Sequence, residues 1–593
     1  MQNNDTNGLL NEAESGMLIA QAQSTSGDSW RLLPYTADIL PIHAALLNTG
    51  KIFFFCGSGN NPDRSNTPYD SVLWDLINGN FTHQRAPTDA SGNPIDFFCA
   101  AQSFQPDGSL MIAGGTLQYD PFHGSPTAFV FNPSTQQLTQ TASMNSGRWY
   151  PTLLTLGSGQ IFAVSGLDVN GGLSIQPEIY SSSFATGWIA FSEPTSSIPQ
   201  YAHLFLLSSG QIFYSGAYMG GNYGVYPRIL TLPNSFTQAI AETPVSGLQD
   251  QDSRNQAASV LLPPAQDQKV MICGGGDGNG TATNKVDIVD LTAIQPTYTP
   301  AASLNNPRMH HSAVLLPDRT VFVCNGSQSE ENTSQGNIPA EIYNPANNTW
   351  TLAATPHVQD RVYHSVALLL PDGSVVTGGG NPARTVDELR LEIYSPAYMS
   401  QTRPVIQSAP STVGYGATIT LQTPQSRNIK WVHLIKPMAT THCYDTEQRL
   451  VDLPIISNTD TSVSVTVTSN QNLAPPGYYM LFVTDNNNVP SVAQWVQLTP
   501  QANTQLQATF YVDANFAGAS QSFPPGVYRA DRGDLNIVDN DNISSLRVPA
   551  GLTVQVCDNS DASGLCANFG PGDYPYVGDQ LNDIISYINV QQQ

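Results

Sequence analysis

The chain alternates short apolar runs with turns and glycines, and this pattern repeats between about residues 40 and 395. Each repeat has a bulky or polar residue, an apolar run, a turn, a second apolar run and one or more glycines. Clear copies are HAALLNTGKIFFFCGSG from His43, CAAQSFQPDGSLMIAGG from Cys99 and HSVALLLPDGSVVTGGG from His364. Apolar runs of this length between turn residues are typical of buried strands. The pattern therefore predicts pairs of antiparallel strands.

The repeat occurs seven times, and its closing glycine returns every 50 to 58 residues. These glycines are Gly57, Gly114, Gly166, Gly216, Gly274, Gly326 and Gly378. A period near 50 residues is typical of kelch repeats, each of which forms one blade of a β-propeller. Segments such as VLWDL, PEIYSS and AEIYNP supply the outer strands. The sequence predicts a seven-bladed kelch-type β-propeller, because an array of β-sandwiches, the alternative, needs no seven matched glycine turns.

Four segments follow from these changes of pattern. Residues 1–29 are polar and predict a mobile tail, and residues 30–398 hold the propeller. Residues 399–502 contain short alternating strands, which favour an immunoglobulin-like β-sandwich. Residues 503–593 form a last β domain with a different pattern. The expected class is thus all-β throughout.

Composition narrows the possible partners. Only 11% of the 593 residues are charged, and the 22 basic and 46 acidic residues give a net charge of −24. Without a basic excess, a nucleic-acid partner is not expected. The chain has no apolar run of about 18 residues, so no membrane span is expected. Residues 1–29 lack the basic-then-apolar pattern of a signal peptide. The seven cysteines are too sparse for a disulfide scaffold, although Cys557 and Cys566 are close enough to pair.

Residues able to bind a metal gather at one predicted mouth of the propeller. The first strand of each blade lines the central axis, so the residues just before it meet there. The contexts GRWYPT, PRMHHS and DRVYHS align Tyr150, His310 and Tyr363, with His364 next to Tyr363, and Cys99 precedes the first strand of another blade. Nitrogen and oxygen ligands suit copper(II), whereas zinc more often takes His, Cys and carboxylate.

The segments FFCAA, RWYPT and RVYHS, followed by TTHCYDTEQR at 440–449, resemble the galactose oxidase and glyoxal oxidase family of copper-radical oxidases. The resemblance extends over about residues 30–500. It implies that Cys99 forms a thioether bond to the ring of Tyr150, and that Tyr150 binds copper and holds a radical. It also implies that Tyr363 is the axial phenol and proton acceptor. His364 and His442 are the implied imidazole ligands.

His442 lies outside the repeats, so a loop of the 399–502 domain must reach into the propeller channel to deliver it. Cys443 follows it where the family more often has a small or hydroxyl residue, and we interpret it as a packed neighbour.

Two absences favour the glyoxal oxidase branch of the family. Galactose oxidase stacks a tryptophan on the radical, but the segment SGLDVNGG at 165–172 has none, which leaves the radical less shielded unless another residue covers it. Galactose oxidase also has an N-terminal sugar-binding domain, for which this chain has no room. Gln251, Asp252 and Arg254 are further polar residues that could line the pocket, or lie on a surface loop.

The last domain resembles a βγ-crystallin module with two Greek-key halves. The calcium motif of that family has two Asn or Asp residues, two variable residues, and then Ser or Thr followed by Ser. NDNISS at 540–545 matches it fully, and NDIISY at 582–587 departs only at the final tyrosine. The oxygen donors expected for calcium are Asn540, Asp541 and Ser544 in the first motif, and Asn582, Asp583 and Ser586 in the second. A metal-free structural role is the alternative.

These observations predict a secreted or cell-surface copper-radical oxidase. It would oxidise small aldehydes or α-hydroxycarbonyls, reduce O2 to H2O2, and use Cu(2+), the Cys99–Tyr150 thioether radical and possible Ca(2+) sites. A galactose-oxidase-like enzyme for primary alcohols or carbohydrates is the near alternative. A non-catalytic kelch scaffold or calcium-dependent adhesin is the distant one. We expect a monomer whose partners are the small substrate and O2.

Overall fold

The computed structural model describes residues 22–23, 27–59, 61, 71–85, 87–89, 91–220, 224–277, 280–330, 338–499, 507–535, 538–549 and 551–592. Most of the tail predicted for residues 1–29 lies outside these ranges. The described residues form 49 strands and short 3-10 turns, with no α-helix among them, so the all-β prediction is confirmed. They divide into two compact units, Met1–Thr499 and Pro500–Gln593.

Seven antiparallel sheets correspond to the seven repeats. In the second to sixth sheets the strands lie in chain order from one edge to the other. The second sheet has β7 (Ala100–Phe104), β8 (Leu110–Gly114), β11 (Ala128–Asn132) and β12 (Gln137–Gln140). The third has β13 (Thr152–Thr155), β14 (Ile161–Val164), β15 (Glu178–Tyr180) and β16 (Trp188–Ala190). The fourth has β17 (Leu204–Leu206), β18 (Ile212–Tyr214), β19 (Arg228–Thr231) and β20 (Ala241–Pro244).

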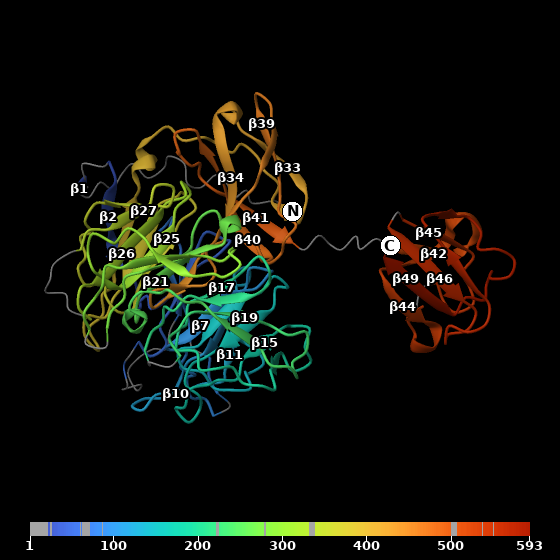
Figure 1. Ribbon diagram of the computed structural model, residues 1–593, viewed down its shortest axis with the longest axis horizontal. Helices are drawn as coiled ribbons and strands as arrows, with labels where there is room; N and C mark the ends of the chain where they lie inside the picture. The colour runs from blue at the N-terminus through green and yellow to red at the C-terminus, as the bar shows by residue number, and fades with distance from the viewer. Residues whose placement is uncertain are drawn as a thin grey trace. The chain divides into compact units, whose positions relative to one another are not determined.

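The fifth sheet has β21 (Ala258–Leu261), β22 (Lys269–Cys273), β23 (Val286–Asp290) and β24 (Tyr298–Pro300). The sixth has β25 (Met309–Leu315), β26 (Val321–Ser327), β27 (Glu341–Asn344) and β28 (Thr349–Leu352). Figure 1 labels strands of several of these sheets, among them β7 and β11 of the second and β25, β26 and β27 of the sixth. A small hairpin, β9 (Thr116–Gln118) and β10 (His123–Gly124), projects from the second repeat.

The first and seventh sheets each take strands from elsewhere in the chain. The first joins β3 (His43–Leu46), β4 (Ile52–Phe55), β5 (Ser71–Trp74) and β6 (Phe81–Gln84) to β35 (Ala439–Thr441) and β36 (Tyr444–Asp445). The seventh joins β29 (Ser365–Leu369), β30 (Val375–Gly379) and β31 (Arg390–Ser395) to β2 (Ser29–Thr36) and β1 (Ala22–Gln23). The two ends of the repeat region therefore meet in one sheet, and β29 contacts β3 of the first sheet.

Burial falls from the first to the last strand of each repeat. All residues of β7, β13 and β29 are buried, whereas the outer strands β12 and β28 are largely exposed. First strands of successive repeats also contact one another, as β7 does β13 and β25 does β29. The first strands therefore occupy the interior, which is the position that a propeller gives them.

The segment after the repeats forms two packed sheets. One has β32 (Thr412–Gly414), β41 (Gln494–Thr499), β40 (Gly477–Asp485), β34 (Ile429–Ile435) and β37 (Leu450–Asp452). The other has β33 (Thr418–Gln422), β39 (Ser462–Thr466) and β38 (Ile455–Asn458). A shared apolar cluster that includes Leu421, Val432, Val463 and Leu481 lies between the sheets, as in a sandwich.

The second unit also has two four-stranded sheets. They are β43 (Ala517–Phe523), β42 (Ala508–Asp513), β45 (Ser545–Val548) and β48 (Gly572–Tyr574), and β44 (Gly526–Arg529), β49 (Tyr587–Gln592), β46 (Leu552–Cys557) and β47 (Cys566–Phe569). Strands from both halves of the segment contribute to both sheets, as a two-part Greek key requires. Cys557 and Cys566, whose pairing the sequence left open, form a disulfide between β46 and β47.

Candidate metal centre

Six repeats present a residue with left-handed backbone at or near the start of the first strand. They are Cys99 (φ 60°), Tyr150 (63°), Tyr201 (43°), Gln256 (59°), His310 (59°) and His364 (67°). A side chain in this conformation costs of order 1–3 kcal/mol unless the surroundings impose it. Backbone hydrogen bonds between repeats do so here: Tyr150 N–H donates to the Cys99 carbonyl at 3.0 Å, and His310 N–H to the Gln256 carbonyl at 3.1 Å. We call these six residues the mouth ring.

The seventh repeat differs from the alignment that the sequence suggests. The DRVYHS context places Tyr363 opposite Tyr150, but it is His364 that shares the left-handed backbone of Tyr150. Tyr363 precedes it, so this one repeat can present two neighbouring donor side chains at the site.

Buried arginine–carboxylate pairs hold the mouth ring in register. Arg148, two residues before Tyr150, donates to the Ser165 carbonyl at 2.8 Å and to Glu178 at 2.9 Å, and both side chains of the pair are fully buried. The equivalent pairs in other repeats are Arg254–Asp287, Arg308–Glu341 and Arg361–Glu392. We call these four the arginine pairs. Arg254, which the sequence suggested as a pocket residue, instead forms a buried ion pair with Asp287.

Two imidazoles point unpaired nitrogens at the same place. Nδ1 of His364 lies 2.9 Å from Asn381 Oδ1. The Asn381 amide nitrogen donates to the Val386 carbonyl, so Oδ1 is an acceptor and His364 Nδ1 carries the proton. Nε2 of His364 then has a free lone pair and no hydrogen-bond partner. Burial lowers the pKa of His364 to about 3, which keeps the ring neutral and able to bind a metal.

His442 has the same arrangement. Its Nδ1 lies 2.6 Å from the Thr441 hydroxyl, which itself donates to the Ile42 carbonyl at 2.9 Å. The hydroxyl oxygen therefore accepts from Nδ1–H, and Nε2 of His442 is left without a partner. Burial also lowers the pKa of His442 well below its ordinary value.

A short hairpin delivers His442. Strands β35 and β36 flank the residue, and β35 pairs with the first strand β3 of the first sheet, Thr441 opposite His43. The loop predicted from the 399–502 segment thus extends the innermost edge of a repeat sheet. His43 lies beside it, with ring centroids 5.8 Å apart. Its Nε2 is also unpaired, a neighbour that sequence reasoning did not single out.

A thiol and two phenols complete the cluster. The Cys99 sulfur and one ring nitrogen each of His364 and His442 all lie within 4.8 Å of one another. The Tyr150 and Tyr363 hydroxyls are hydrogen-bonded to each other. Burial raises the pKa of the Cys99 thiol and of the Tyr150 phenol well above their ordinary values, and a hydrogen bond to Tyr150 partly offsets the effect on Cys99.

Trp149 covers Tyr150. The two rings are stacked, with centroids 3.8 Å apart and planes 6° from parallel, and Phe122 stacks on the other side of the indole at 4.2 Å. Trp149 is therefore the residue that covers Tyr150 in place of the tryptophan absent from 165–172. The signal was present in the RWYPT context, because the indole comes from the residue directly before Tyr150 rather than from the loop after the glycines.

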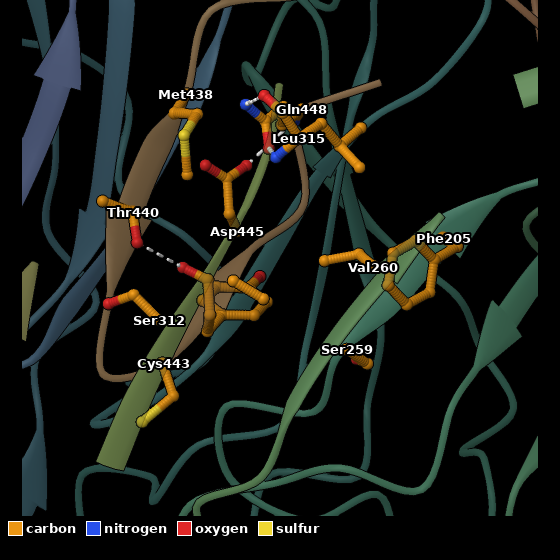
Figure 2. A pocket seen from close by; sticks show the side chains of 12 residues that line it. Phe205, Ser259, Val260, Ser312, Leu315, Met438, Thr440, Cys443, Asp445 and Gln448 are labelled. Carbon is orange, nitrogen blue, oxygen red and sulfur yellow. Dashed lines mark hydrogen bonds between the residues drawn. The ribbon is translucent and has the colours of Figure 1, made fainter. Parts of the chain in front are cut away.

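Cys443 lies in a cavity beside the cluster. Figure 2 shows its side chain together with Ser312, Met438 and Asp445, all of which line this cavity. Within the described residues, the group of His, Cys and carboxylate side chains that could share a metal contains Cys99 and not Cys443. This agrees with the interpretation of Cys443 as a neighbour. Burial raises the pKa of Asp445 to about 8.

The donor set fits copper(II). Two neutral, buried imidazoles with unpaired Nε2 atoms converge with two phenol oxygens and a sulfur, and nitrogen with anionic oxygen is the set that this ion prefers. Each ligating imidazole is fixed through its other nitrogen, the arrangement typical of metal-binding histidines. Tyr150, Tyr363, His364 and His442 would hold the ion.

The two suggested calcium motifs of the second unit lie together. The Ser544 hydroxyl donates to Asp583 at 3.0 Å, and the Ser586 hydroxyl donates to Asp541 at 3.0 Å, so each motif pairs with the other. Asn582 Oδ1 is buried and has no hydrogen-bond partner. The geometry places a serine from one motif beside an aspartate of the other.

The family models match the two parts of the first unit. Residues 71–398, more than half of the 593-residue chain, match the model described as glyoxal oxidase N-terminus. The chain belongs to the glyoxal oxidase family. Residues 403–498 match the galactose oxidase-like early set domain. The family named from the FFCAA, RWYPT, RVYHS and TTHCYDTEQR segments is thus confirmed.

Named relatives come from both branches of the family. An aldehyde oxidase GLOX of Vitis pseudoreticulata is 26% identical over 80% of this chain and 97% of its own length. A galactose oxidase of Gibberella zeae is 27% identical over 68% of this chain but only 61% of its own length. A fungal alcohol oxidase solved in complex with copper shares the fold, with a TM-score of 0.67 and 24% identity over 79% of this chain and 99% of that one.

Proposed function

We propose that this member of the glyoxal oxidase family is a copper-radical oxidase. It oxidises small aldehydes or α-hydroxycarbonyls and reduces O2 to H2O2. The observation that carries this proposal is the convergence of two unpaired imidazole nitrogens with Cys99, within 4.8 Å, beside the paired phenols Tyr150 and Tyr363. The aldehyde oxidase relative, of which the chain covers 97%, supports the choice of substrate class.

Bound copper supplies a one-electron couple and a Lewis acid that lowers the pKa of the substrate oxygen. The reaction removes two electrons and two protons from the substrate, so the chain must supply a second one-electron carrier and a proton acceptor. Tyr363 suits the second role, because its hydroxyl is at the site and hydrogen-bonded to Tyr150. As a phenolate it takes the proton of the substrate hydroxyl.

Tyr150 suits the role of electron carrier. A thioether link from the Cys99 sulfur to its ring would lower the potential at which the phenol loses an electron. The link forms by loss of one hydrogen from the thiol and one from the ring, and O2 accepts both. Trp149, stacked 3.8 Å from Tyr150, covers one face of the ring and excludes water from it.

Mass analysis tests the link directly. Protein loaded with copper in air should be two hydrogens lighter than apoprotein, and the peptides that contain Cys99 and Tyr150 should be joined. Cys99→Ala is the control, because it removes the sulfur and leaves the two imidazoles. Separate peptides from fully copper-loaded wild-type protein would contradict the proposal.

The substrate class needs its own comparison. Peroxide output on methylglyoxal, glyoxal and glycolaldehyde should exceed that on galactose. A preference for galactose would favour the second candidate, a galactose-oxidase-type alcohol or carbohydrate oxidase, for which a relative of that name 27% identical is the supporting observation. An absence of copper uptake would leave a non-catalytic scaffold.

We further propose that the second unit binds calcium and that the protein works outside the cell. The crossed pairs Ser544–Asp583 and Ser586–Asp541 and the unpaired Asn582 oxygen support oxygen ligation. The Cys557–Cys566 disulfide supports an oxidising compartment. Among the described residues no helix is both long and apolar enough to cross a membrane.

A further inference from the structure

His310 is a member of the mouth ring that the copper cluster does not use. Its side chain is 2% exposed, Nδ1 has no hydrogen-bond partner, and the nearest polar group to Nε2 is the Glu330 carboxylate at 3.6 Å, beyond hydrogen-bond distance. The imidazole lies beside Tyr363, with ring centroids 5.4 Å apart. A buried imidazole with a nitrogen that makes no hydrogen bond loses the bond that water would give it. Such a group beside a reactive site is expected to bind a polar molecule that reaches the site.

Glu330 approaches His310 from the solvent side. Its carboxylate lies 3.6 Å from His310 Nε2 and is 49% exposed. The pKa of Glu330 lies below its ordinary value, chiefly because of its interaction with His310. The carboxylate therefore stays charged and orients the imidazole. Gln256, whose carbonyl accepts from the His310 N–H, adds an unpaired side-chain oxygen to the same wall.

We propose that His310, oriented by Glu330, binds a second oxygen atom of the substrate. One substrate oxygen occupies the copper site beside Tyr363, and the other hydrogen-bonds to the His310 imidazole. The preferred substrates then carry two oxygens on one carbon or on adjacent carbons, as hydrated aldehydes and α-hydroxycarbonyls do. This inference rests on the proposed oxidase function and explains its substrate class.

The chemistry of both partners fits. An imidazole ring offers N–H donors to a polar ligand, and each hydroxyl of a hydrated aldehyde can accept such a hydrogen bond. A monohydric alcohol has only the oxygen that the copper site takes, so His310 contributes nothing to its binding. Sites built to pair a substrate hydroxyl discriminate strongly against analogues that lack it.

The test compares two substrates in the copper-loaded full chain. His310→Phe should lower kcat/KM for methylglyoxal about 10- to 100-fold, mostly through KM. The same variant should change kcat/KM for 1-butanol by less than about threefold. Glu330→Ala, at a half-exposed position where folding is not at risk, should show the same selectivity with a smaller loss. His83→Phe, which breaks the exposed His83–Asp38 pair, is the matched control and should change neither.

Binding without turnover gives a second readout. Calorimetry with reduced, anaerobic holoenzyme should show about tenfold weaker binding of methylglyoxal to His310→Phe than to wild type. The Cys99–Tyr150 mass loss should persist in the variant, which would show that the cluster is intact.

Three results would overturn the inference. One is equal fractional loss on both substrates with KM unchanged, which would mean that His310 only positions Tyr363. The others are unchanged kinetics and unchanged methylglyoxal affinity. Wild-type holoenzyme that makes no peroxide from any substrate would instead refute the oxidase function, and the calorimetric comparison would still report on His310.

Discussion

Arg148→Met tests whether the arginine pairs hold the metal centre together. Arg148 is fully buried and donates to the Ser165 carbonyl at 2.8 Å, the Gln176 carbonyl at 2.5 Å and Glu178 at 2.9 Å. Methionine fills much of the volume but donates to none of them. Glu178 keeps bonds from Asn145 and Ser146, yet it loses its only ion-pair partner among the described residues.

The expected cost is about 3–5 kcal/mol, because breaking a buried pair leaves an uncompensated charge. Guanidinium unfolding followed by tryptophan fluorescence measures it, with Arg384→Met as control. Arg384 and Asp120 are 41% and 59% exposed, so losing that pair should cost less than about 1 kcal/mol. The double variant Arg148→Met/Glu178→Met should recover much of the loss.

Because Arg148 lies two residues before Tyr150, the variant should also lower the yield of Cys99–Tyr150 cross-link at full copper loading. Equal destabilisation by Arg148→Met and Arg384→Met, with normal cross-link yield, would refute the reasoning.

Four further outcomes are expected. Cys99→Ala should retain copper and lose most peroxide output, and equal turnover in the two proteins would remove the thioether from the mechanism. His442→Asn should lower the copper-to-protein ratio measured by mass spectrometry, since it removes an unpaired, buried nitrogen, and full loading would exclude His442 as a ligand. Folded Asp445 keeps its proton up to about pH 8, against an ordinary pKa of 3.8, so unfolding free energy should fall as pH rises through this window. Asp445→Asn should remove part of that fall, and identical pH profiles would argue against the raised pKa. Millimolar calcium should raise the melting temperature of the second unit, Asp583→Asn should reduce the effect, and no shift in wild type would count against calcium sites.

The repeat period was enough to predict most of the fold. Seven glycine-closed strand pairs predicted seven sheets, because buried strand pairs and left-handed glycine turns are encoded locally. The same register placed Cys99, Tyr150 and His310 at one mouth. The addition of β2 to the seventh sheet could not be predicted from the local sequence. Pairing between strands so far apart in the chain depends on which sheet edges remain open in the folded protein.

The details of the site were less predictable. The stack of Trp149 on Tyr150 depends on a left-handed turn between first strands, and the sequence shows no such turn. The equivalence of His364, not Tyr363, with Tyr150 depends on the same backbone geometry. The commitment of Arg254 to Asp287 could have been expected, because an arginine recurs two residues before Tyr150, His310 and Tyr363. In each of these three repeats the arginine pairs with a glutamate of the third strand, namely Glu178, Glu341 or Glu392.

The pairing of β2 with β31 has a consequence during synthesis. Tyr394 bonds to Asp28 across 366 residues. At translation rates of about 5–20 residues per second, the first partner waits roughly 20 to 70 s for the second to leave the ribosome. Throughout that interval a nascent chain carries an open strand edge that can join another molecule. The seventh sheet is therefore completed only after the whole repeat region has been synthesised.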